Sequence, residues 1–148
     1  MWSHLLLGGI VSLVNFAIHA LVTGVIVEAT RHTAKRTDHL HAFLRLTSLL
    51  TITMIFLMIA HVCEISVWGL YYNWQSAAPG GTTPFEFAFE NYTALGYGDP
   101  APPAGKRLIG PITSLNGLLL IGWSVAIIFE VMRMAEVQFT RLDEKDQS

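Results

Sequence analysis

Two glycines that flank one aromatic residue could place a row of backbone carbonyls along one side of the chain. They belong to the segment Thr93-Ala94-Leu95-Gly96-Tyr97-Gly98-Asp99. Glycines at alternate positions allow backbone angles of opposite hand, so successive carbonyl oxygens can point the same way. Rings of such oxygens, contributed by several chains, can replace the water around a cation. The segment therefore predicts a cation site built from main-chain atoms.

A short helix is expected directly before this segment, over residues 84–93. Thr83 can cap it, Pro84 fits the first helical position, and Glu86 can bond back to the backbone of the cap. The negative C-terminal end of this helix would lie near the carbonyl row, where its dipole favours a cation.

Three apolar stretches, at 5–27, 46–70 and 108–132, are long enough to cross a bilayer. Each exceeds the roughly 20 residues that a helix needs to span the hydrocarbon core. Hydrophobic residues make up 52% of the 148 residues and charged residues 14%, which indicates a membrane protein. Because non-helical backbone at membrane depth must be buried or line water, we expect a sheltered, re-entrant segment between the second and third stretches.

The loop between the first two stretches is basic and indicates the orientation. Over 31–45 it carries one acid, Asp38, against four basic residues: Arg31, Lys35, Arg36 and Arg45. Short loops with this bias lie on the cytoplasmic side. We therefore expect a multi-pass protein of the cell membrane with its N-terminus outside and its C-terminus in the cytoplasm.

Several function classes are disfavoured. A net charge of −2 without a basic face argues against a nucleic-acid partner. Glu90 and Asp99 could be imagined as an acid–base pair, but no nucleophile, metal or cofactor motif accompanies them. We expect no enzymatic activity and no cofactor.

From about 46 to 132 the sequence resembles the potassium channel pore family, whose subunits set two membrane helices around a pore helix and a Thr-Val-Gly-Tyr-Gly filter. By that pattern Gly96, Tyr97 and Gly98 match the Gly-Tyr-Gly of the filter. The resemblance implies a potassium-selective channel subunit, with K⁺ at the filter carbonyls as the only bound metal. It further implies that Glu90 and Asp99 share a hydrogen bond that braces the filter.

The sequence departs from the family pattern at two places. Ala94 replaces a threonine whose hydroxyl helps to line the innermost ion site, so potassium preference is expected to persist with weaker inner binding and reduced barium block. The family's flexible glycine falls on Asn116, one residue before Gly117. Gly117 and Gly122 are therefore the candidate gating hinges.

The fold class expected is an all-α membrane protein with three transmembrane helices, a re-entrant pore helix and a filter, assembled as a homotetramer in lipid with three further copies of itself. The domains expected are an extra N-terminal helix at 1–30, a basic loop at 31–45, a pore domain at 46–134 and a tail at 135–148. Within the pore domain we expect an outer helix at 46–72, the pore helix at 84–93, the filter at 94–98 and an inner helix at 108–134.

Two alternatives stay open: a weakly selective cation channel of the same fold, and a non-conducting structural subunit. Two polar pairs within the spans, His61 with Glu64 and Asn15 with His19, each share a helix face. We interpret both pairs as structural contacts rather than as a metal site.

Overall fold

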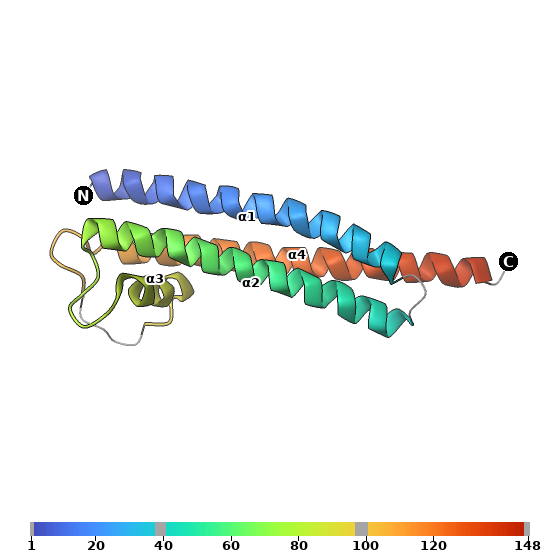
Figure 1. Ribbon diagram of the computed structural model, residues 1–148. Coiled ribbons are helices and arrows are strands. Elements are labelled where there is room, and N and C mark those ends of the chain that lie inside the picture. Colours follow the sequence, from blue (N-terminus) through green and yellow to red (C-terminus); the bar gives the residue numbers. More distant parts are fainter. Residues whose placement is uncertain (1, 38–40, 97–100, 147–148) are drawn as a thin grey trace. The chain divides into compact units, whose positions relative to one another are not determined.

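The computed structural model describes residues 2–37, 41–96 and 101–146, and the side chains of 3–37, 41–96 and 101–136. Its regular elements within these ranges are helices (Figure 1): α1 (Trp2–Arg36), α2 (Ala42–Gln75), α3 (Pro84–Thr93) and α4 (Ile109–Asp146). Three of them, α1, α2 and α4, are long and apolar enough to cross a membrane. The expected all-α fold with three spans is therefore confirmed.

The long helices continue well past the apolar stretches. α1 extends to Arg36, α2 already begins at Ala42, and α4 runs to Asp146. The loop expected at 31–45 and the tail expected at 135–148 are thus largely helical where the structure describes them. Hydropathy marks only the part of a helix that suits lipid, and neither 28–36 nor 135–146 contains a glycine or proline that would stop the helix.

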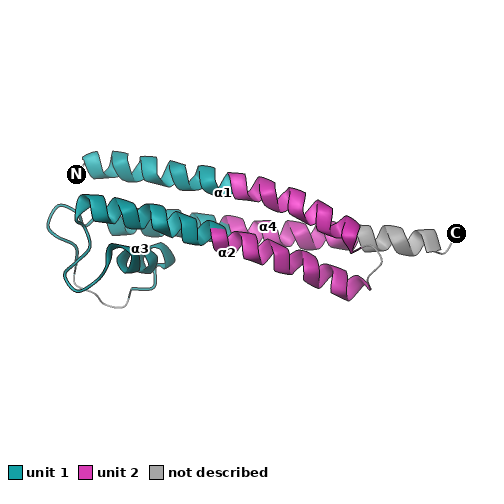
Figure 2. Ribbon diagram, in the orientation of Figure 1, with its two compact units in different colours: residues 1–20, 60–122 teal, residues 21–59, 123–148 magenta. Residues whose placement is uncertain are grey.

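The chain divides into two compact units, which Figure 2 colours separately. Unit 1 comprises Met1–Ala20 and Ala60–Gly122 and contains α3. Its core is rich in aromatic side chains, with Trp68, Tyr72 and Tyr92 almost completely buried. The segment predicted to bind cations begins in this unit.

Unit 2 comprises Leu21–Ile59 and Trp123–Ser148. Its core is aliphatic, with Ile26, Leu49 and Val131 among its buried members. It contains the basic end of α1, where Lys35 and Arg36 lie in the last turn.

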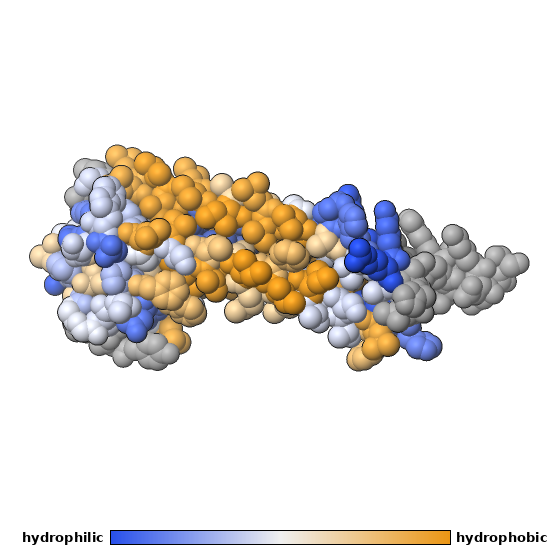
Figure 3. Space-filling view, in the orientation of Figure 1, coloured by the Kyte–Doolittle hydropathy of each residue, from blue (hydrophilic) through white to orange (hydrophobic). Residues whose placement is uncertain are grey.

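The surface of the long helices is strongly apolar. Hydrophobic side chains cover much of what Figure 3 displays of them, and Leu6, Leu13 and Leu70 are each about 70% exposed. Apolar surface on this scale is unstable in water. Lipid or other protein chains must cover it.

A lysine fixes the chain where α2 ends. Ser76 has a left-handed φ of 46°, and the Lys106 ammonium donates hydrogen bonds to the carbonyls of Gln75 and Ser76, the latter at 3.1 Å. A cation at this point complements the negative end of the α2 dipole. Lys106 thereby ties the segment before α4 to the end of α2.

Candidate functional site: the pore helix and the start of the filter

The first turn of α3 is held by a reciprocal capping box. The Thr83 hydroxyl accepts a hydrogen bond from the Glu86 amide at 3.2 Å, and the Glu86 carboxylate accepts one from the Thr83 amide at 2.8 Å. Pro84 occupies the first turn without losing a hydrogen bond. The Thr83 backbone amide and hydroxyl lower the pKa of Glu86 because they bind its ionised form. The helix spans Pro84–Thr93, the range expected for the re-entrant helix.

The last turn of α3 ends in a left-handed residue that turns the chain out of the helix. Ala94 has φ 55°, and its amide donates to the carbonyl of Asn91 at 3.0 Å. The next amide, of Leu95, donates to the Glu90 carbonyl at 3.1 Å. These bonds satisfy carbonyls that the helix itself leaves without donors.

The residues directly after α3 have backbone angles of opposite hand. Ala94 and Gly96 have φ of 55° and 60°, whereas Leu95 between them does not have a positive φ. The expectation from the sequence put this alternation on the two glycines, but within the described residues it begins at Ala94. A non-glycine residue in this region carries strain of about 1–3 kcal/mol. All three residues are exposed in the single chain.

The backbone of α4 lies very close to the C-terminal end of α3. A Cβ at Gly117 would lie 2.0 Å from the Tyr92 carbonyl oxygen, and one at Gly110 would lie 2.6 Å from the Asn91 side-chain oxygen. The Ser114 hydroxyl donates a hydrogen bond to the Asn91 carbonyl at 2.6 Å. Small residues at these positions of α4 therefore let the two helices touch.

Two tyrosines, one on α2 and one on α3, connect α3 to its neighbours. Tyr72 packs edge-on against Phe87 of α3, and its hydroxyl lies 3.1 Å from the Thr113 hydroxyl of α4. Tyr92 of α3 donates a hydrogen bond to the Glu64 carboxylate of α2, and its hydroxyl lies 2.8 Å from His61 Nδ1. α3 is thus held against α2 by a ring contact and a side-chain hydrogen bond.

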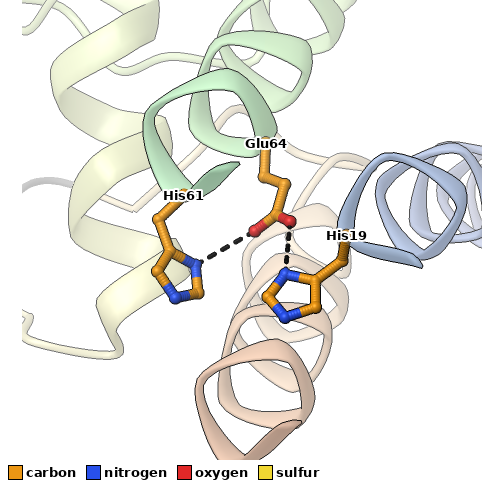
Figure 4. A group of neighbouring side chains, drawn as sticks. All are labelled: His19, His61 and Glu64. Atoms are coloured by element: carbon orange, nitrogen blue, oxygen red, sulfur yellow. Dashed lines mark hydrogen bonds and ion pairs between the residues drawn. The ribbon is translucent and has the colours of Figure 1, made fainter. Parts of the chain in front are cut away.

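A buried polar group joins α1 to this assembly. His19 Nδ1 lies 2.8 Å from Glu64 Oε1, and His61 Nδ1 lies 3.0 Å from Glu64 Oε2 (Figure 4). Nearby, Asn116 of α4 accepts hydrogen bonds from the side chains of Asn15 at 3.1 Å and Trp68 at 2.9 Å. The two polar pairs interpreted separately from the sequence therefore meet within one unit.

The structure describes some, but not all, of the other residues predicted for the site. Glu90 is buried within α3, whereas Tyr97, Gly98 and Asp99 lie outside the described residues. Gly122 is exposed on α4, with no described atom within 4 Å of a Cβ built there.

Tyr92 and Asn116 were missed as interacting residues by the sequence analysis. Asn116 was noted only for its place in the family pattern. A polar residue within an apolar span is itself a signal of an interhelical contact, although the spacing cannot name its partner.

A family model described as an ion channel matches residues 46–134, more than half of the chain. The matched range covers α3 and most of α2 and α4 and leaves α1 outside. No curated protein matches the chain, and no solved structure does. With three helices able to span a bilayer, the chain is a multi-pass membrane protein that belongs to the ion channel family.

Proposed function

We propose that four copies of this chain form a potassium-selective channel, with the carbonyls of residues 94–98 from each copy lining the ion sites. The observation that carries the proposal is the alternating backbone hand at Ala94, Leu95 and Gly96 directly after a capped pore helix. This alternation lets successive carbonyl oxygens face one side and replace the water of a dehydrated K⁺.

Assembly into a closed ring is supported by what a single chain leaves exposed. Leu95 is 58% exposed, although it lies where the filter begins. On α4, Leu115, Leu118 and Leu119 share one helix face and are each more than half exposed. One chain surrounds an ion on only one side, whereas four copies around an axis would enclose it and cover apolar surface.

The proposed orientation has the basic end of α1 in the cytoplasm. Arg31, Lys35 and Arg36 are exposed there, and Arg133 on α4 pairs with Glu130 at 2.6 Å. Asp38, the only acid of the predicted loop, lies outside the described residues. The excess of cations supports a cytoplasmic location for this end.

Glu90 is proposed to brace the filter together with Asp99. Glu90 is 8% exposed on α3, four residues before Ala94, and the family pattern has its acidic residue at this position. If the double variant Glu90→Ala, Asp99→Asn left potassium flux and its decay with time unchanged, the brace would be excluded.

Cation flux into liposomes that contain the purified protein tests the proposal. We expect potassium flux well above sodium flux, with partial block by barium because Ala94 lacks the hydroxyl of the family's threonine. Ala94→Ser should increase the barium block, since it adds a hydroxyl without the β-branch that a left-handed residue rarely tolerates. Equal potassium and sodium fluxes would instead support the weakly selective channel.

A matched pair of glycine variants distinguishes a specific effect on the filter from a general loss of folding. Gly96→Ala should strongly reduce flux, because φ at this residue is 60° and a second left-handed alanine adds about 1–3 kcal/mol of strain to that of Ala94. Gly80→Ala should leave flux unchanged, because Gly80 is exposed and no described atom lies within 4 Å of its Cβ position. Absence of flux from an intact wild-type tetramer would favour the non-conducting alternative.

A further inference from the structure

A buried carboxylate lies between two imidazoles in unit 1. His19, on α1, is 1% exposed and Glu64, on α2, is 0% exposed. His61 lies on α2 one turn before Glu64, so both side chains reach the same side of this helix. Figure 4 shows the two rings on either side of the carboxylate. The sequence analysis interpreted these residues as structural, because spacing along α2 revealed only two of the three.

The three side chains already have the spacing that one metal ion requires. One ligand atom from each, a ring nitrogen or a carboxylate oxygen, lies within 4.8 Å of the other two. Zinc binds such atoms at about 2.0–2.2 Å, which places two tetrahedral ligands about 3.4 Å apart. The nitrogen–oxygen distances of 2.8 and 3.0 Å therefore need to open by only about half an ångström.

The donor set also selects a class of ion. Two imidazoles and one carboxylate suit zinc and neighbouring transition metals, whereas Mg²⁺ and Ca²⁺ prefer ligands that are all oxygen. Three protein ligands leave a fourth tetrahedral position for water or another group. The Tyr92 hydroxyl stands beside that position, because it lies 2.8 Å from His61 Nδ1 and bonds the Glu64 carboxylate.

The position of the group in the fold favours the same conclusion. Carboxylates within membrane spans are costly and are retained where they are paired or hold a ligand. The His61 side chain is 18% exposed, so one edge of the group is open to an entering ion. We propose that His19, His61 and Glu64 form a binding site for a zinc-type divalent metal ion that links α1 and α2 beside the pore helix.

Metal binding at this site does not depend on whether the channel selects potassium. It can therefore be measured directly on the purified protein in detergent. After chelator treatment and removal of any affinity tag, the protein is titrated with Co²⁺ as a spectroscopic substitute for zinc. We expect one Co²⁺ per chain, with the strong visible absorption of a tetrahedral site, and displacement by Zn²⁺ but not by Mg²⁺.

Three glutamine variants decide whether the ion occupies this site. His61→Gln and His19→Gln should each weaken Co²⁺ binding at least tenfold. His4→Gln is the control, because His4 is a histidine of the same chain outside the cluster, and it should not change binding. His61→Gln alone is decisive if His19→Gln does not fold, because His61 is partly exposed and less critical for packing. Wild-type protein that binds no Co²⁺, or binding that survives in both His61→Gln and His19→Gln, would overturn the proposal.

Discussion

The α-carbon of Gly117 lies directly against the backbone carbonyl of Tyr92, so closely that an added Cβ would stand 2.0 Å from that oxygen. The resemblance to potassium channels suggested a gating hinge for this glycine. In the structure, its lack of a side chain is already required by the contact between α4 and the end of α3.

Gly117→Ala should therefore destabilise the protein. The obstructing atoms belong to backbone and cannot rotate away, so α3 or α4 must shift at a cost of about 1–3 kcal/mol or more. Thermal unfolding of the purified protein in detergent measures the loss.

Gly122→Ala is the matched control on the same helix. No described atom lies within 4 Å of its Cβ position, and alanine is favoured over glycine in a helix by about 1 kcal/mol. We expect equal or greater stability than wild type. If Gly117→Ala were as stable as Gly122→Ala, the close contact would not exist in the assembled protein.

Tyr92→Phe should weaken the attachment of α3 to α2. The variant removes the hydroxyl that donates to Glu64 and contacts His61. The expected loss is about 0.6–1.7 kcal/mol, between the average and the largest value for interhelical hydrogen bonds within membranes. Tyr71→Phe is the control, since the buried Tyr71 hydroxyl has no hydrogen-bond partner among the described residues. Equal unfolding temperatures for the two variants would contradict the role of Tyr92.

The capping box makes stability depend on Thr83 and on pH. Thr83→Ala should cost about 1 kcal/mol, as the loss of an N-cap does. Because the folded state lowers the pKa of Glu86, its contribution is present above the unfolded pKa of about 4.3 and is lost as pH falls through the lower, folded value. Unfolding temperatures measured between neutral and acidic pH should show this decline.

Glu86→Gln isolates the titrating group, because glutamine can still accept the bond from the cap but does not ionise. In this variant the part of the acid-induced decline that comes from Glu86 should be absent. An identical pH profile for Glu86→Gln and wild type would mean that the capping box does not contribute to the acid sensitivity.

Labelling of single cysteines tests the proposed orientation. In a Cys63→Ala background, Ser3→Cys should react with a membrane-impermeant maleimide added outside intact cells, because Ser3 lies at the exposed start of α1. His41→Cys, exposed before α2, should react only after the membrane is opened. The reverse pattern would place the basic end of α1 outside and contradict the charge rule.

Local signals in the sequence accounted for the parts of the fold that local interactions determine. The three spans follow from hydropathy, and the bounds of α3 follow from Thr83, Pro84 and Glu86, which interact within one turn. The length of α4 was underestimated, because a charged segment without glycine or proline can continue a helix beyond the lipid.

Interactions between helices could not be predicted in the same way. His19 and Glu64 are far apart in the sequence, and the helix face that each residue occupies does not identify the helix opposite. Gly117 gave no signal of close packing, because a glycine at a hinge and a glycine at a helix contact look the same in one sequence. The left-handed angle of Ala94 was also missed, since alanine has no preference for that region.

The reversal potential across a planar bilayer, with potassium on one side and sodium on the other, is the most direct test of the central claim. If residues 94–98 form a potassium filter, the reversal potential should lie far from zero with the sodium side positive, and the current should fall strongly in Gly96→Ala but persist in Gly80→Ala. A reversal potential near zero in the wild-type protein would contradict potassium selectivity and leave a non-selective cation pore.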